Sequence, residues 1–167
     1  DPEPAPSPGV LGESPAMIEA GSGSILLSYA VPFNESRGVY LAASDEAGLQ
    51  WGVPVEVFDG ASAGCDRLGQ HSLTSVGGAT LDLAWICSSL PGGIGPLAVY
   101  HSRSDDGGVS WSEPAQVLER GAAWGQIGAD GDGELHFVWE EHVGGRITTW
   151  DSLSRDGGET WDDPVWV

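Results

Sequence analysis

Three segments of the chain alternate between large apolar residues and smaller or polar ones. They are residues 24–31 (SILLSYAV), 80–87 (TLDLAWIC) and 134–141 (ELHFVWEE). Aligned, their large residues recur at every second position: Ile25, Leu27 and Tyr29; Leu81, Leu83 and Trp85; Leu135, Phe137 and Trp139. A period of two residues is typical of a β-strand that buries one face. Each segment is therefore predicted to be a strand whose large side chains pack in a core.

The rest of the chain also favours strands. No stretch of ten or more residues has the period of an amphipathic helix, whereas glycine (26) and proline (11) are frequent, as in proteins built of short strands and tight turns. In the last third of the chain, further strands are predicted near 125–129, 146–152 and 163–167. The fold class is therefore predicted to be all-β, in units of four antiparallel strands.

An eight-residue motif occurs once in each unit, as SDEAGLQW (44–51), SDDGGVSW (104–111) and SRDGGETW (154–161). The copies share a serine, an acid, a glycine and a tryptophan: Ser44, Glu46, Gly48 and Trp51; Ser104, Asp106, Gly108 and Trp111; Ser154, Asp156, Gly158 and Trp161. Their starts lie 60 and 50 residues apart, a period found in propeller blades and large solenoid units.

The residue types of the motif suit a corner between the third and fourth strands of a unit. Glycine adopts positive φ at little cost, and the acid can accept hydrogen bonds from turn amides. The tryptophan can then fold back as a buried plug. This structural role is favoured over a catalytic loop.

The motif resembles the Asp-box, Ser-x-Asp-x-Gly-x-Thr-Trp, of sialidases and related β-propellers (BNR repeats). The third copy matches in full, the second has Ser110 in place of threonine, and the first departs at Glu46 and Gln50. The resemblance implies four-stranded antiparallel propeller blades, with three blades in this chain and six in a complete ring. The implied divisions are a Pro-rich linker at 1–13 and blades at 14–60, 61–120 and 121–167.

Three blades alone would expose two large apolar sheet faces to water, because each blade of a propeller packs between two neighbours. The remaining blades are therefore expected from a second copy of the chain or from a missing chain segment. Both sources remain open.

The charge of the chain limits its partners. It has 25 acidic and 6 basic residues, for a net charge of −19, so nucleic acids and anionic membrane surfaces are not expected as partners. No apolar run approaches the roughly 20 residues of a membrane span. The expected partners are a glycan or another protein.

Binding residues are expected on the face opposite the corners, where the second strand leads to the third and where each first strand begins. Arg37, Arg67, Arg120 and Arg146 carry guanidinium groups suited to a sugar carboxylate, and Trp124 offers an aromatic platform. Glu140 is a further ligand-binding candidate. For Trp124, packing at the start of a strand is the alternative.

The resemblance to sialidases also implies catalytic residues: a nucleophilic tyrosine with a glutamate partner, an acidic residue, and three arginines. The family's Phe-Arg-Ile-Pro motif has no counterpart, since YAVP at 29–32 lacks the arginine. The tyrosines fall at strand positions that are aromatic in the other units. Asp66 as the acid and Glu140 or Glu141 as the partner compete with simple loop solvation. Catalytic residues are therefore not assigned.

No metal site is predicted from the four histidines, whose spacing is not that of metal ligands. The acidic segment at 130–134 (DGDGE) could attract calcium or could simply form a hairpin turn. No other cofactor is expected.

Cys65 and Cys87 are expected at the same edge of the second unit. A disulfide there would contribute about 3 kcal/mol and indicate an oxidising compartment; two reduced thiols are the alternative. With the disulfide, the expected location is extracellular or at the cell surface. The leading hypothesis is a glycan-recognising sialidase-like propeller, with hydrolase activity left open. A structural or protein-interaction module is the rival.

Overall fold

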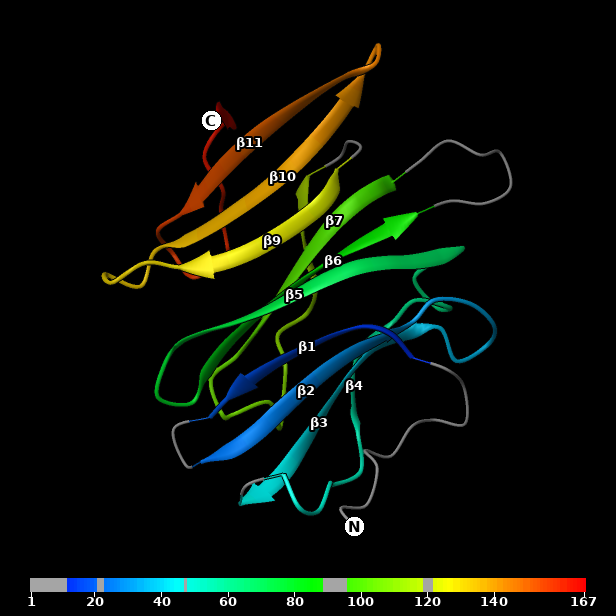
Figure 1. The fold of residues 1–167 in the computed structure, drawn as a ribbon, viewed down its shortest axis with the longest axis vertical. Helices are drawn as coiled ribbons and strands as arrows, with labels where there is room; N and C mark the ends of the chain where they lie inside the picture. The colour runs from blue at the N-terminus through cyan, green and yellow to red at the C-terminus, as the bar shows by residue number, and fades with distance from the viewer. Residues whose placement is uncertain (1–11, 21–22, 47, 89–95, 119–121) are drawn as a thin grey trace.

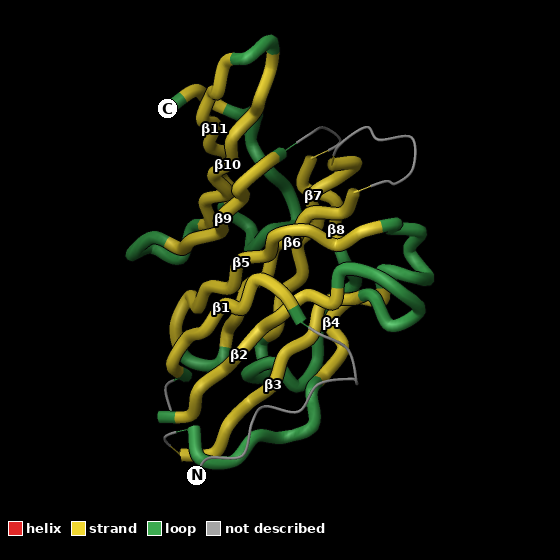
Figure 2. The backbone as a smooth tube through the Cα atoms, turned by 45° about the vertical axis from the view of Figure 1, so that its right-hand side comes forward, coloured by secondary structure: helices red, strands yellow, loops and turns green. Residues whose placement is uncertain are grey.

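The computed structural model describes residues 12–20, 23–46, 48–88, 96–118 and 122–167 (Figure 1). These residues form strands joined by turns and loops, without a helix (Figure 2), which confirms the all-β prediction. The strands are β1 (Glu13–Glu19), β2 (Ser24–Val31), β3 (Gly38–Glu46), β4 (Val55–Asp59), β5 (Arg67–Gly77), β6 (Thr80–Ser88), β7 (Pro96–Ser104), β8 (Ala115–Leu118), β9 (Ala123–Ala129), β10 (Leu135–Val143), β11 (Arg146–Ser154) and β12 (Val165–Trp166).

The strands form three four-stranded antiparallel sheets, each built from consecutive strands. The first sheet contains β1 to β4, the second β5 to β8 and the third β9 to β12. The three segments with alternating residues are the second strands of the sheets, β2, β6 and β10, as predicted. The first strand, β1, begins at Glu13, the last residue of the expected linker.

The sheets are stacked with their first strands side by side, so that β5 lies between β1 and β9 (Figure 1). The second sheet packs on both faces. Leu81, Leu83 and Trp85 join the core shared with the first sheet, whereas Ala84 and Ile86 join the core shared with the third. Alternation along β6 thus divides one strand between two cores.

The second and third corners have the same hydrogen bonds. In the third, Ser154 Oγ accepts from Gly158 N (2.8 Å) and donates to Asp156 Oδ1 (2.9 Å). Thr160 N and Oγ1 donate to the same carboxylate, and Trp161 Nε1 donates to Gly158 O (3.2 Å). The second corner repeats this with Ser110 in the place of Thr160. These bonds lower the pKa of Asp156 to about 2, chiefly through Thr160, and the tryptophans of the corners are half-buried.

The first corner differs from the other two. Its turn amide, Gln50 N, donates to Asp45 Oδ1 (2.8 Å), and Ser44 Oγ accepts from Ile25 N (2.8 Å). The side chain of Glu46 lies outside the described residues. The acid one position earlier than the motif predicts therefore accepts the turn amide here.

The second and third corners, the two regular ones, each place a glycine against a side chain of the preceding sheet. A Cβ at Gly108 would lie 2.2 Å from Leu41 Cδ2, and one at Gly158 would lie 2.1 Å from His101 Cε1. His101 also binds the fully buried Asp82, with Nε2 and Oδ1 2.9 Å apart. Between the first and second sheets the corner glycine thus meets an apolar side chain, Leu41. Between the second and third sheets it meets His101, which is paired with Asp82.

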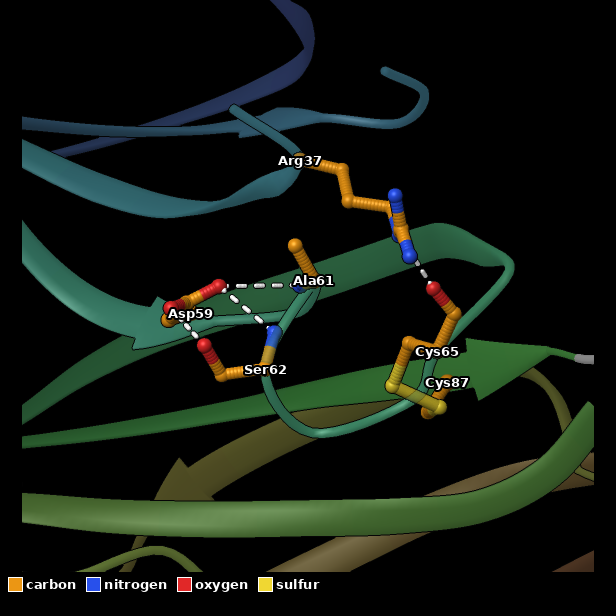
Figure 3. Close-up of a disulfide and its surroundings, with 6 residues drawn as sticks. All are labelled: Arg37, Asp59, Ala61, Ser62, Cys65 and Cys87. Atoms are coloured by element: carbon orange, nitrogen blue, oxygen red, sulfur yellow. Dashed lines mark hydrogen bonds between the residues drawn. A yellow bond between two sulfur atoms is a disulfide. The ribbon is translucent and has the colours of Figure 1, made fainter. Parts of the chain in front are cut away.

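A disulfide joins Cys65 to Cys87, with their Cα atoms 5.5 Å apart, so the alternative of two reduced thiols was wrong (Figure 3). Both residues are buried in the core between the first two sheets. Arg37 Nε donates to Cys65 O, and Asp59 Oδ1 accepts from Ala61 N (2.9 Å) and Ser62 N (2.9 Å). The disulfide and these bonds fix the connection between the first and second sheets. No helix long and apolar enough to cross a membrane occurs in the described parts of the chain.

Candidate functional site

Each first strand begins with a β-bulge against its second strand. The register shifts between Glu13 and Ala16 in β1, between Leu68 and His71 in β5, and between Ala123 and Gln126 in β9. In each case the first strand advances three residues while its partner advances two. A bulge changes the direction of the neighbouring side chains. The first strands of the three sheets (β1, β5 and β9), called the inner strands below, therefore begin with the same distortion.

Two of these bulges contain a non-glycine residue with positive φ. Ser14 (φ 53°) and Trp124 (φ 54°) occupy the same position, one residue after the start of the shift. A left-handed conformation costs an ordinary residue about 1–2 kcal/mol. Trp124 nevertheless leaves 63% of its surface exposed, so packing at the start of the strand, the alternative considered from the sequence, does not describe it. The next residue, Gly125, has no room for a side chain, since a Cβ would lie 2.5 Å from Phe137 Cζ.

The bulges line a cleft made of two adjoining cavities of about 370 and 330 Å³. Both volumes are in the range typical of small-molecule sites. Ser14, Gln70 and Trp124 line both cavities. The first cavity is also lined by Glu13 and Arg67. The second cavity extends along the inner strands and is also lined by the polar residues His71, Ser72 and Gln126.

One ion pair lies at the rim of the cleft. Arg67 Nη2 is 3.9 Å from Glu13 Oε2, and both side chains are about half exposed. The guanidinium carbon of Arg67 also lies 5.3 Å from the centre of the Phe33 ring. An exposed pair of this kind contributes little to stability, but it places an opposite charge beside the arginine.

The floor of the cleft carries neutral polar groups. Ser72 Oγ accepts from Ile127 N (3.1 Å) and lies 3.4 Å from Gln126 Oε1, which links β5 to β9. His71 Nε2 lies 3.0 Å from Ser28 Oγ of the first sheet. Burial lowers the pKa of His71 to about 4. Its imidazole is therefore uncharged at neutral pH.

The structure brings together two of the six candidates identified from the sequence, Arg67 and Trp124. Arg37 instead donates to the carbonyl groups of Cys65 and Asn34. Glu140 Oε2 pairs with His142 Nε2 at 3.0 Å. Arg146 is the first residue of β11, at the turn of the hairpin formed by β10 and β11. Arg120 lies outside the described residues.

Sequence reasoning missed the carboxamides and Glu13. Gln70 is the last residue of the candidate segment 64–70 but was not singled out, and Gln126 is the first residue after the candidate segment 119–125. The residue before each of them is a glycine, Gly69 or Gly125. A glycine inside a strand pattern signals a bulge. That signal could have located both glutamines.

The described residues show no tyrosine placed as a nucleophile in the cleft. Tyr29 and Tyr40 stack on each other in the first sheet, with ring centres 5.7 Å apart, and both are buried. Burial, followed by the neighbouring Tyr40, raises the pKa of Tyr29 to about 12. Tyr100 stacks on Phe58 in the core between the first two sheets.

The acidic segment at 130–134 forms a turn. Asp130 Oδ1 accepts from Asp132 N (2.9 Å) and Glu134 N (2.9 Å). Over the described ranges of the chain, no group of three or more histidine, cysteine, aspartate or glutamate side chains is placed to hold a metal ion.

Comparison with known proteins supports the fold. No protein-family model and no curated protein matches the sequence. A solved protein of unknown function from Dyadobacter fermentans superposes with a TM-score of 0.70 at 18% identity, over 90% of this chain and 53% of its own. A Hadza microbial sialidase gives a TM-score of 0.68 at 21% identity, over 92% of this chain and 37% of its own.

A third similar structure is a family 117 glycoside hydrolase from the marine bacterium Zobellia galactanivorans. It has a TM-score of 0.65 at 12% identity, over 87% of this chain and 53% of its own. The chain thus spans between 37% and 53% of these structures. At such identities the likeness concerns the fold alone, an all-β, propeller-like fold shared with glycosidases.

Proposed function

We propose that this chain is part of an Asp-box propeller of the sialidase-like type and that it recognises glycans in the cleft at the entries of β1, β5 and β9. The observation that supports this most directly is the exposed indole of Trp124, held in a left-handed bulge at the edge of that cleft. Strain of this kind persists where the surrounding structure imposes it, and it is commonly found at functional sites.

The composition of the cleft suits a sugar. An exposed indole offers a flat apolar surface to the C–H groups of a pyranose ring, while carboxamides and hydroxyls can pair with the ring hydroxyls. Trp124 supplies the apolar surface, and Gln70 and Ser14 supply the carboxamide and the hydroxyl. The glycosidase names among the structural neighbours support the same substrate class.

Hydrolysis of a sialoside is the second candidate function, favoured by the sialidase among the neighbours. Glu13 is the one carboxylate among the described residues that line the cleft, and it is paired with Arg67. A retaining or inverting glycosidase uses two acidic groups, or a tyrosine in place of one. Recognition without hydrolysis is therefore the function that the described residues support best.

We also propose that further sheets of the same kind complete a ring. Leu41 and His101 each meet the corner glycine of the following sheet. The matching position of the third sheet is Asp151, which pairs with His136 (Oδ2 to Nδ1, 3.0 Å) and is partly exposed. Ile147 and Val165, on the same face, are exposed too. A covering sheet from a second copy or from another chain segment would bury this face.

The proposed location is extracellular or at the cell surface. A buried disulfide between Cys65 and Cys87 persists in oxidising compartments. The glycosidase neighbours are consistent with this location.

Incubating the chain on a glycan array and with a fluorogenic sialoside tests the function. Binding on the array without release of the fluorophore is the expected result. Release of the fluorophore would establish the second candidate function. The absence of both signals would contradict both glycan functions and favour a structural or protein-interaction module.

A further inference from the structure

We propose that the cleft at the entries of β1, β5 and β9 takes uncharged sugar rings and does not select the carboxylate of a sialic acid. This inference rests on the proposed glycan recognition and specifies its ligand class. It is argued from the charges, the hydrogen-bonding groups and the aromatic surface that line the cleft.

The cleft has little positive charge to offer an anion. The chain contains no lysine, and Arg67 is the one arginine among the described residues that line either cavity. Its guanidinium faces Glu13 at 3.9 Å and stays about half exposed. A bidentate carboxylate would have to displace Glu13 or share the arginine with it, and two carboxylates on one guanidinium repel each other.

The remaining polar lining is both donor and acceptor. Gln126 and Ser72 are already bonded within the protein: Gln126 Nε2 donates to Gly125 O (3.2 Å), and Ser72 Oγ donates to Gln126 Oε1 (3.4 Å) and accepts from Ile127 N (3.1 Å). Gln70 offers a carboxamide, which donates through nitrogen and accepts through oxygen, and Ser14 adds a hydroxyl with the same dual capacity. Sugar hydroxyls also donate and accept, so they can satisfy these groups in pairs, whereas a carboxylate can only accept.

The position of Trp124 adds an apolar surface between the two sets of polar groups. It lines both cavities together with Ser14 and Gln70. A ring stacked on the indole would therefore have hydrogen-bonding groups on either side of it. The net charge of −19 acts in the same direction, because a protein field of that sign lowers the local concentration of anionic ligands.

The test uses the full chain and pairs of glycans that differ by one sugar. An array carries neutral oligosaccharides, including lactose, and the same oligosaccharides capped with one sialic acid, including 3′-sialyllactose. The best-binding pair is then titrated by calorimetry against the unmodified chain and against Trp124→Ala. Trp166→Ala is the matched control, since Trp166 is 75% exposed on β12, the strand at the outer edge of the third sheet.

The expected result is binding of a neutral oligosaccharide, no tighter binding of its sialylated partner, and at least a tenfold loss of affinity in Trp124→Ala but not in Trp166→Ala. If Trp124→Ala does not fold, Trp124→Phe is titrated and should bind more weakly than the unmodified chain.

Two other results overturn the inference in different ways. Sialylated partners that bind at least tenfold more tightly than the neutral ones would refute the ligand class while preserving glycan recognition. The same result would draw attention to Arg120, which lies outside the described residues. Failure of every array member to bind would refute the proposed function as well.

Discussion

Trp124 combines two features that a folding protein ordinarily avoids: a left-handed backbone conformation in a bulky residue and a mostly exposed indole. The bulge accounts for the first, since Ser14 takes the same conformation at the same position of β1. Nothing in the core requires an indole at position 124. Substitutions at position 124 can therefore distinguish the cost of the backbone conformation from the contribution of the indole.

Replacing Trp124 by glycine should give a more stable protein than replacing it by alanine. Glycine adopts a φ of 54° without the steric cost that alanine keeps, so the difference in the free energy of unfolding should be about 1 kcal/mol. Urea denaturation of both variants measures it. Equal stabilities would show that the left-handed conformation is not imposed at this position in solution.

His71 should make stability depend on pH. Its folded pKa, about 4, lies below the ordinary value of 6.5 because burial of the ring outweighs the opposing effect of the hydrogen bond with Ser28. The unfolded chain therefore binds a proton first as the pH falls. Stability should be complete above pH 6.5 and fall between pH 6.5 and 4, by about 3 kcal/mol at the lower limit.

His71→Gln separates this effect from those of other groups, because an amide can still reach Ser28 but does not titrate. The variant should lose much less stability than the unmodified chain between pH 6.5 and 4.5, as measured by urea denaturation at each pH. Parallel losses in the two proteins would assign the effect to other groups. The corner aspartates act at lower pH, since hydrogen bonds from Ser110 and Thr160 hold the pKa of Asp106 and Asp156 at about 2.

At the scale of elements, the corner and the strand before it act as one packing unit. The glycine at the fifth position of the motif serves two purposes in the two regular corners: it takes a φ of 90°, and it makes room for a side chain of the preceding sheet. The glycine one position earlier takes a similar φ, but in the second corner a side chain there would meet open space. The two positions distinguish backbone strain from packing between sheets.

Gly107→Ala and Gly158→Ala should therefore differ in their cost. Both place alanine at positive φ, which costs about 1 kcal/mol. A Cβ at Gly158 must also displace the His101 ring, which is buried and bound to Asp82, at a further cost of about 2 kcal/mol. Thermal and urea denaturation measure both variants. Equal losses would mean that the sheets adjust to the added methyl group.

The sequence predicts the elements well because the signals for them are local. Alternation located β2, β6 and β10, and the repeated motif located the three corners, with the correct serine, acid and glycine in the second and third. The bulge in β1 has no local signal, since a bulge is a property of the register between two strands. Gln70 and Gln126 escaped notice because the glycines before them, Gly69 and Gly125, were not interpreted as signs of a bulge. Arg67 and Trp124 were found because they lie at strand entries, where loops were searched.

Two polar exchanges show where local signals fail. In the first corner Asp45 accepts the turn amide although the motif points to Glu46. In the second sheet a buried Asp82 pairs with His101, and in the third the two residue types are reversed, as His136 and Asp151. Each pair joins neighbouring strands, so its members lie 15 to 19 residues apart in the sequence. Burial of such a pair is tolerable only when both partners are present.

At the scale of the whole molecule, the acidic residues far outnumber the basic ones. The ion pairs seen around Arg67, Arg103 and Arg155 engage only some of the acids. The excess negative charge repels itself in the compact state, and it does so less in the expanded unfolded chain. Added salt should therefore stabilise this protein, since the Debye length falls from about 30 Å at 0.01 M to about 3 Å at 1 M.

Raising NaCl from 10 to 500 mM should increase the midpoint of thermal unfolding by roughly 3–6 °C, corresponding to about 1–2 kcal/mol for a chain of this size. A variant with Asp132→Asn, Glu159→Gln and Asp163→Asn provides the control, because these three residues are exposed. It should unfold at a higher temperature than the unmodified chain in 10 mM NaCl and gain less from added salt. Differential scanning calorimetry at both salt concentrations measures the two proteins. If the midpoint does not move, or if the variant gains as much as the unmodified chain, repulsion among the acids is not what limits stability.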